Sequence, residues 1–206
     1  MTTSFSKRLL NWQKILLLFV ISFPLAISAQ ENNKLLFNDS WQFHMGELTN
    51  KSDANWKNVS IPHDWSIQSD FDSRWASGTG FLPGGIAYYK KSFDVQNYSP
   101  NKKYSIYFDG VYKNSEVWIN GHFLGKRPNG FIPFQYDLTP YLNETENEIL
   151  VKCNHTDYAD SRYYTGSGIY RNVYLIQQNP IHFSQWGVFV TTPKIEKDEA
   201  ELNIQL

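Results

Sequence analysis

The stretch "YSIYFDGVYKNSEVWINGHFLGK", Tyr104–Lys126, decides the fold class of this chain. Its first run, "YSIYF", places aromatic or apolar residues at every second position, which is the period of a β-strand. A second run, "SEVWI", follows after a short polar break, and we expect both runs to lie in one sheet. Asn120-Gly121 then predicts a two-residue hairpin, because both central positions of a type I′ turn need the positive φ that Asn and Gly tolerate.

The same pattern continues along the chain. Short runs at "FIPFQYDLT", "NEILVKC" and "NVYLIQQ" are separated by turn signals roughly every ten residues, a spacing typical of a sandwich or jelly roll. Pro133 predicts an edge strand or a bulge, because proline cannot donate to a strand ladder. No helical periodicity is sustained beyond the N-terminal segment, so the sequence predicts an all-β fold, a β-sandwich or jelly roll.

Two segments depart from this pattern. Residues 50–85 are rich in Gly, Pro, Trp, Asp and Ser, and a long irregular segment in a compact domain is usually functional. We expect it to cross one rim of the sandwich. After Pro180 new runs begin at "IHFSQWGVFVTTP" and "LNIQL", and two strands cannot bury a core by themselves. A second β domain, incomplete at Leu206, is therefore expected to start near residue 180.

The N-terminal segment has the features of a secretory signal peptide. Lys7, Arg8 and Lys14 precede the apolar run Ile15–Ala29, which ends in small residues as cleavable signals do. The alternative, a membrane anchor, needs about 20 apolar residues, and this run is shorter and contains proline. We predict a signal peptide over residues 1–29, cleaved near Ala29 or Ser28, and a periplasmic or secreted protein.

Charge and cysteine content narrow the function classes. Removal of the three basic residues of the signal peptide from the 19 Lys+Arg leaves 16 against 20 Asp+Glu, so nucleic acid is not an expected partner. The single cysteine, Cys153, lies in a strand pattern and is predicted to be a buried, inert thiol. Aromatic residues make up 17% of the chain, which suits either a large sandwich core or sugar binding by ring stacking.

Four stretches, in order along the chain, resemble the amino-terminal sugar-binding domain of glycoside hydrolase family 2, which includes β-galactosidases, β-glucuronidases and β-mannosidases. One such stretch is a weak signal, but four in register are strong. "LPGGIAYY" and "ADSRYYTGSGIYR" favour the β-galactosidase branch. The four stretches are "WQFHMGE" with "VSIPHDWSI", "GGIAYYKKSFDV", "YFDGVYKNSEVWINGHFLGKRPNGFIPFQYDLTPYL" and "SRYYTGSGIYRNVYL".

The resemblance implies a domain order. Residues 33–178 are expected to form the sugar-binding domain, a jelly-roll or galactose-binding-like β-sandwich, and residues 180–206 the start of an immunoglobulin-like sandwich. In the family a TIM barrel follows and carries two glutamates of a retaining mechanism, about 5 Å apart. Both catalytic glutamates are expected beyond residue 206, so this chain is predicted to have no catalytic residue and no activity alone.

The family's acid/base glutamate usually follows an asparagine, and two such pairs occur here. Asn143-Glu144 and Asn147-Glu148 stand in a polar connection before a strand. We predict that both pairs belong to the solvated surface.

The resemblance also implies a substrate loop. In the family an acidic residue ahead of the "G-I-aromatic-R" turn contacts the sugar, and either Asp160 or Arg162 stands at that position, depending on the gap allowed in "TGSG". A carboxylate accepts two hydroxyl hydrogen bonds and a guanidinium donates a fork of them, so both suit the role. Alternatively the two side chains pair with each other or cap the turn. Tyr163 is expected to stack on the sugar or pack under the loop, and for Tyr164 packing is favoured.

A second cluster is "HDW", His63, Asp64 and Trp65. It has no third ligand at metal spacing and no nearby serine nucleophile, so we predict a rim loop with a polar contact to substrate or barrel, and no metal site. Trp65 and Trp75 are candidate sugar platforms or buried loop anchors.

His155 and Asp157 precede the substrate loop closely. Both are predicted to support that loop from behind.

These features predict the non-catalytic, sugar-binding front end of an exo-acting β-galactosidase-like glycosidase. The alternatives are a free-standing carbohydrate-binding module without hydrolytic activity, or the front end of a β-glucuronidase or β-mannosidase. Expected partners are a β-galactoside and the chain's own immunoglobulin-like and barrel domains, with no nucleic acid and no membrane after signal cleavage. No cofactor is expected in this chain, and a divalent or monovalent metal in the barrel is left open.

Overall fold

A computed structural model describes residues 33–49, 55–159 and 161–206 of the 206-residue chain. The predicted signal peptide lies outside these residues, and so does Asp160. Among the described residues, no helix is long and apolar enough to cross a membrane.

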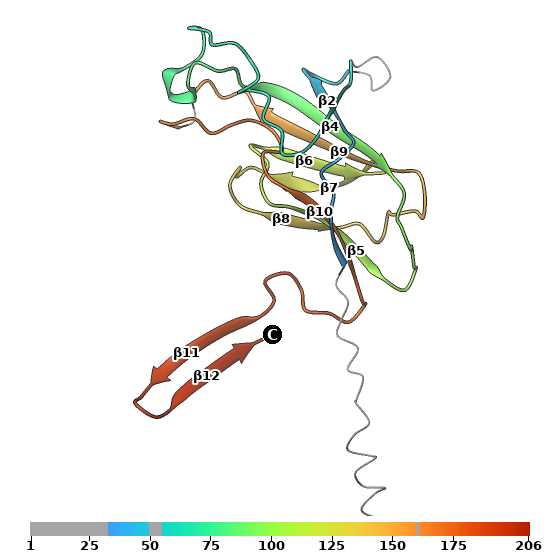
Figure 1. The fold of residues 1–206 in the computed structure, drawn as a ribbon, viewed down its shortest axis with the longest axis vertical. Coiled ribbons are helices and arrows are strands. Elements are labelled where there is room, and N and C mark those ends of the chain that lie inside the picture. Colours follow the sequence, from blue (N-terminus) through green and yellow to red (C-terminus); the bar gives the residue numbers. More distant parts are fainter. Residues whose placement is uncertain (1–32, 50–54, 160) are drawn as a thin grey trace, which may run out of the picture. The chain divides into compact units, whose positions relative to one another are not determined.

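The described chain is built from antiparallel strands, as the alternating patterns predicted (Figure 1). One sheet has four strands in the order β1-β10-β5-β8, and a second has six in the order β3-β2-β4-β9-β6-β7. The fold class is therefore all-β, with two sheets that share one core. The strands are β1 (Asn33–Leu36), β2 (Trp41–Met45), β3 (Lys57–Val59), β4 (Gly85–Phe93), β5 (Lys103–Phe108), β6 (Ser115–Ile119), β7 (His122–Arg127), β8 (Phe134–Asp137), β9 (Asn147–His155), β10 (Val173–Gln178), β11 (Phe189–Ile195) and β12 (Ala200–Gln205).

Alternate side chains of both sheets form this core. Trp41, Tyr89 and Ile149 come from the six-stranded sheet, and Phe108 and Phe134 come from the four-stranded one. The rings of Phe108 and Phe134 stack with centroids 5.0 Å apart. Cys153 is completely buried in the same core, as predicted, and burial raises the pKa of its thiol.

The Asn120-Gly121 hairpin is confirmed, but one expectation around it is wrong. Both turn residues have positive φ, +48° and +82°, and they join β6 to β7. However, β5 and β6 lie in different sheets, because the chain between them crosses from one sheet to the other through the buried Val111 and Tyr112. Residue alternation reports which face of a strand is apolar and does not report which sheet the strand joins.

Two further predictions have clear outcomes in the structure. The proline-containing segment before β8 leads into an edge strand of the four-stranded sheet, as Pro133 predicted. The prediction that Asn147 belongs to the solvated surface is wrong, because its side chain is 1% exposed. Its amide oxygen accepts hydrogen bonds from the Asn143 backbone and the Asn120 side chain, so it fixes the connection between strands.

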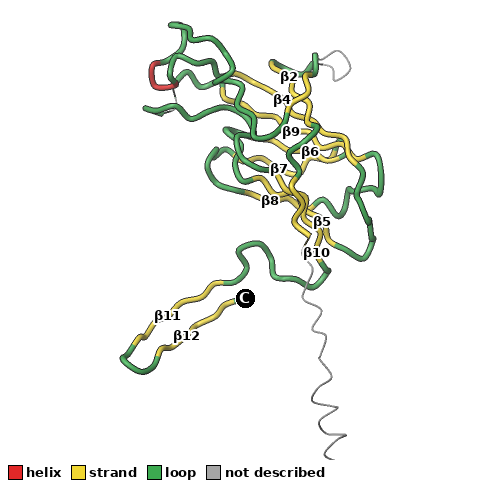
Figure 2. Tube along the Cα trace, in the orientation of Figure 1, coloured by secondary structure: helices red, strands yellow, loops and turns green. Residues whose placement is uncertain are grey.

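The segment between β3 and β4 is irregular, as predicted. Figure 2 shows it as loop interrupted by the short helical turn η1 (Ser77–Thr79). β11 and β12 pair with each other and, within the described chain, with no other strand. The assignment of residues 180–206 to an incomplete second domain stays a prediction.

Candidate functional site

Two segments far apart in sequence are joined at one rim of the sandwich. The His63 amide donates to the Ile169 carbonyl at 2.8 Å, and the Trp65 amide donates to the Ser167 carbonyl at 3.2 Å. Gly168 lies between these bonds with φ of +109°, which favours glycine. The backbone bonds therefore hold the start of the long loop against the glycine turn of residues 165–168.

Asp64 is the residue that ties the two segments together. Its Oδ1 accepts hydrogen bonds from the backbone amides of Ser66 at 3.0 Å and Ser167 at 2.9 Å. Its Oδ2 accepts from the Tyr164 hydroxyl. Burial, and then the hydrogen bond to the Asp64 carboxylate, raises the pKa of Tyr164, so its hydroxyl stays a proton donor. One carboxylate thus fixes three groups on both loops.

A buried chain of hydroxyls lies beneath this carboxylate. Ser66 Oγ is 2.5 Å from Ser167 Oγ and 2.6 Å from the Pro83 carbonyl, and His155 Nδ1 is 2.7 Å from Ser167 Oγ. All three contacts are satisfied together when His155 Nδ1 donates to Ser167, Ser167 to Ser66, and Ser66 to the carbonyl. Ser66, Ser167 and His155 are all buried. We therefore interpret this hydrogen-bonded network as a support for the turn of residues 165–168.

His155 therefore lies behind the substrate loop, where the sequence predicted a supporting residue. Asp157 makes a different contact, an ion pair with Lys113 Nζ at 2.5 Å.

His63 and Trp65 are buried, which favours the loop-anchor alternative for Trp65 over the sugar platform. His63 is 6% exposed and Trp65 is 4% exposed, and the indole packs near Phe43 with ring centroids 6.0 Å apart. A buried ring offers no face to a sugar, so Trp65 anchors the loop. Asp64 is half-buried between these two buried neighbours, and its carboxylate reaches the backbone amide of Ser167.

Both ring nitrogens of His63 have a hydrogen-bond partner. Nδ1 lies 2.8 Å from the Tyr89 hydroxyl, and Nε2 lies 3.3 Å from Gln68 Oε1. Because an amide oxygen only accepts, the proton belongs on Nε2 and the Tyr89 hydroxyl donates to Nδ1. Burial lowers the pKa of His63 below its ordinary value of 6.5.

This lowered pKa predicts a loss of stability in mild acid. The unfolded chain binds a proton on His63 below about pH 6.5, while the folded chain resists it, so the free energy of unfolding falls as pH drops through that window. In urea unfolding between pH 8 and pH 5, His63→Gln should show a shallower fall than the wild type. His122→Gln, an exposed control on β7, should keep the wild-type slope. Equal slopes for wild type and His63→Gln would contradict the assignment.

Residues 162–164, in the predicted substrate loop, face solvent. Arg162 is exposed, and Tyr163 is 61% exposed. The packed position expected for Tyr164 is wrong, because its ring is 39% exposed and its hydroxyl is held by Asp64. The structure does not describe Asp160, so its contact with Arg162 or with a sugar stays a prediction.

A pocket of about 430 Å³ opens between the two segments. Its wall combines the carboxylate of Asp64 with the side chains of Tyr164 and Ile67, and Ile67 is strongly exposed. Such a mixture of an acceptor with apolar surface suits a sugar ring, which has hydroxyls at its edge and C–H groups on its faces. The remaining lining residues are Pro62, His63, Gln68, Thr165, Gly166 and Tyr170.

Sequence reasoning missed the partners of Asp64. Ser66 is a local partner of Asp64, but Tyr164 and Ser167 carry no pattern that links them to it, because these two contacts join positions about 100 residues apart. Across the described ranges, no group of three His, Cys, Asp or Glu side chains is placed to hold a metal. The expectation that no metal binds here stays a prediction.

Residues 34–180 match the model of the glycosyl hydrolases family 2 sugar binding domain. The chain is 46% identical over 176 residues to beta-galactosidase BoGH2A of Bacteroides ovatus, which covers 82% of this chain and 21% of that protein. It is 39% identical over 175 residues to a putative beta-glucuronidase of Formosa agariphila, with 82% and 17% covered. A crystal structure of a beta-glycosidase from Bacteroides vulgatus matches with a TM-score of 0.74 at 43% identity, covering 84% of this chain and 24% of that one. This chain therefore spans about a fifth of the length of these relatives.

Proposed function

This chain belongs to glycosyl hydrolases family 2 through the sugar-binding domain at residues 34–180, and from that membership we propose that it is the non-catalytic front end of a retaining exo-β-glycosidase. The proposed substrate is a terminal β-D-galactose of an oligo- or polysaccharide. The chemistry would take place in a barrel domain beyond residue 206. Export to the periplasm or the medium belongs to the same proposal, since the segment 1–29 has a signal-peptide pattern.

The observation that carries the proposal is the set of hydrogen bonds that the Asp64 carboxylate accepts from Ser66, Ser167 and Tyr164. It holds the turn of residues 165–168 rigidly against the sandwich, and the exposed Arg162 and Tyr163 stand immediately before that turn. A rigid support lets a short loop present a guanidinium fork and an aromatic ring at a set position. We propose that these two side chains contact the sugar, together with Asp160.

A second candidate substrate is a β-glucuronide. The exposed guanidinium of Arg162 is suited to a sugar carboxylate, because Arg–carboxylate pairs form two parallel hydrogen bonds. The 39% identity to a putative beta-glucuronidase supports this alternative. The 46% identity to a beta-galactosidase supports galactose.

Kinetics of the full-length enzyme test this proposal. We expect hydrolysis of a chromogenic β-galactoside, with kcat/KM lowered about tenfold or more in Arg162→Ala and in Tyr163→Ala, since each removes a substrate contact of about 1.4 kcal/mol. Asp160→Ala should behave alike. Arg74→Ala is the matched control, because this exposed arginine is paired with Asp72, and it should keep wild-type kinetics.

Three outcomes separate the alternatives. If the enzyme hydrolyses a β-glucuronide and not the galactoside, and Arg162→Ala abolishes this activity, the substrate is a glucuronide and the galactose proposal is wrong. Wild-type kinetics in all three loop variants would contradict the sugar contact. Hydrolysis by the 206-residue chain itself would contradict the placement of the catalytic glutamates beyond it.

A further inference from the structure

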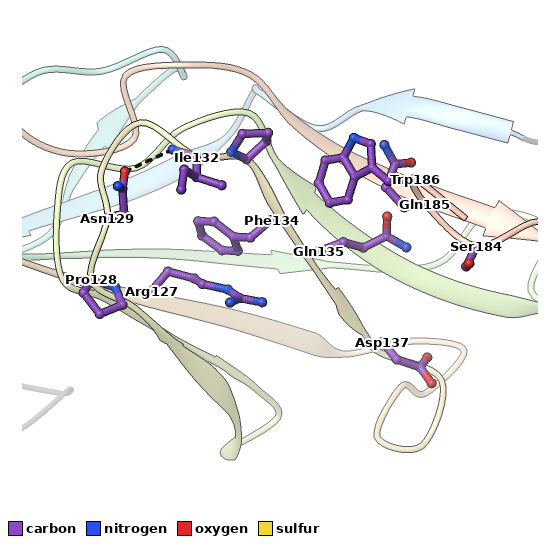
Figure 3. A pocket seen from close by; sticks show the side chains of 11 residues that line it. Arg127, Pro128, Asn129, Ile132, Phe134, Gln135, Asp137, Ser184, Gln185 and Trp186 are labelled. Atoms are coloured by element: carbon purple, nitrogen blue, oxygen red, sulfur yellow. Dashed lines mark hydrogen bonds between the residues drawn. The ribbon is translucent and has the colours of Figure 1, made fainter. Parts of the chain in front are cut away.

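A second pocket lies over the outer face of the four-stranded sheet, away from the rim residues described above. It has a volume of about 560 Å³ and is formed by the end of β7, by β8, and by the segment that follows Pro180 (Figure 3). This volume lies within the range of small-ligand sites. Its lining residues are Arg127, Pro128, Asn129, Ile132, Pro133, Phe134, Gln135, Asp137, Ser184, Gln185 and Trp186.

One side of this pocket is an exposed aromatic ring that is nevertheless held in place. Trp186 is 64% exposed, and its ring centroid lies 6.1 Å from that of the buried Tyr107, at an interplanar angle of 51°. Lys34 Nζ lies 4.7 Å from the centroid of the same tyrosine ring. The contact with Tyr107 orients the indole while most of its surface stays accessible. An oriented, accessible indole is a surface on which a C–H face can stack.

The other side of the pocket carries one acceptor, on Gln135, without a hydrogen-bond partner in the part of the chain that is described. The Gln135 amide nitrogen donates to Ser105 Oγ at 2.8 Å, whereas its buried Oε1 receives no hydrogen bond from the residues that the structure describes. A buried acceptor without a donor is unfavourable, and an occupant with hydroxyl hydrogens would relieve that cost. Figure 3 shows this amide beside Trp186, with the indole and Gln185 at the same end of the pocket.

Arg127 contributes a charged donor. Its guanidinium points into the space below Phe134 and Gln135 in Figure 3. The same guanidinium lies over the Tyr136 ring, 5.8 Å from its centroid. The lining contains one further charged side chain, Asp137, so the pocket has one charge of each sign. This balance favours an uncharged ligand with many hydroxyls over an anion or a cation.

We propose that this pocket is a second saccharide-binding site, which takes one neutral pyranose unit of a glycan. The C–H face of the sugar stacks on Trp186, one hydroxyl donates to Gln135 Oε1, and the Arg127 guanidinium donates to a ring substituent. Its role is to hold the glycan near the enzyme by a contact that adds to the one at the rim, and linked contacts raise overall affinity through effective concentration. None of its lining residues lines the Asp64 pocket, so the site does not depend on the role of Arg162 or Tyr163.

Oxidative footprinting of the full-length protein tests the site at the residue itself. Hydroxyl radicals should oxidise Trp186, and a saturating S-linked β-1,4-galacto-oligosaccharide, which a glycosidase does not cleave, should lower that oxidation at least about fivefold, because a stacked sugar covers the ring. Phe189, which is 60% exposed in the same segment, is the internal control and should not change. Gln135→Leu should raise the sugar concentration for half-protection about tenfold, as expected for one lost hydrogen bond of about 1.4 kcal/mol.

The outcomes are separable from those of the proposed function. Arg162→Ala should impair hydrolysis and leave the protection of Trp186 intact. The proposal is overturned if sugar leaves the oxidation of Trp186 unchanged, or if Trp186 is already protected without sugar because another part of the full-length protein covers it. Equal half-protection in wild type and Gln135→Leu would also overturn it.

Discussion

Replacing Gly168 by alanine should lower the free energy of unfolding by more than about 4 kcal/mol, which is an exceptional loss for one methyl group. A Cβ at this position would lie 2.2 Å from the Tyr89 hydroxyl and 2.9 Å from the His63 carbonyl oxygen. Tyr89 is completely buried, and the His63 backbone is held by its bond to Ile169. Neither group can move away without opening the core, so overpacking adds to the backbone strain at φ of +109°.

Gly46→Ala is the matched control for this prediction. Gly46 has nearly the same φ, +107°, but a Cβ there would meet no atom within 4 Å. It should therefore show the conformational cost alone, about 1–2 kcal/mol. Urea unfolding of the 206-residue chain measures both values. Equal losses in the two variants would show that the contact with Tyr89 and His63 is not what excludes a side chain at residue 168.

Asp64→Ala should lower the free energy of unfolding by about 3 kcal/mol, since it removes three hydrogen bonds to a carboxylate. The loss is concentrated at the Ser167 amide, because Ser167 is completely buried and its N–H would have no acceptor. The Tyr164 hydroxyl would lose its acceptor, Asp64 Oδ2, and would no longer hold the loop in place. In the full-length enzyme we therefore also expect a loss of kcat/KM, without any direct contact between Asp64 and the reacting atoms.

Asp64→Asn separates the contacts of this carboxylate. An amide oxygen at the Oδ1 position still accepts from the Ser66 and Ser167 backbones, whereas an amide NH₂ at the Oδ2 position cannot accept from the Tyr164 hydroxyl. We expect about a third of the stability loss of Asp64→Ala, measured in the same urea series. Asp72→Ala, which removes an exposed carboxylate paired with Arg74, should leave the unfolding midpoint unchanged. If Asp64→Ala left the free energy of unfolding unchanged, the loop would be held by its backbone hydrogen bonds alone.

The local parts of the fold could be read from the sequence because their causes are local. The Asn120-Gly121 turn, the edge strand predicted from Pro133 and the alternation of "YSIYF" each depend on neighbouring residues. The allocation of strands to sheets could not be read in this way. β5 and β6 have the patterns expected of neighbours, yet they lie in different sheets, because the buried Val111 and Tyr112 carry the chain across the core.

The candidate site also has a part that the sequence predicts and a part that depends on tertiary contacts. Its two segments were both predicted, "HDW" as a rim loop and residues 160–164 as a substrate loop. Which side chains face outward was not predictable. The sequence left Trp65 open between a sugar platform and a buried anchor, and it grouped the buried His63 with the possible substrate rim. A histidine or tryptophan has the same local sequence signal whether it contacts a ligand or anchors a loop, and only the packing around it separates the two.

The sequence by itself determined the all-β class, the family and the order of the segments, because these follow from residue periodicity, turn chemistry and motif spacing. The tertiary structure alone decided that Asp64 ties two loops about 100 residues apart, that Gly168 admits no side chain, and that Trp186 comes to lie beside Gln135. Each of these depends on long-range contacts whose geometry is set by the packed sheets, and no local signal along the chain records such contacts.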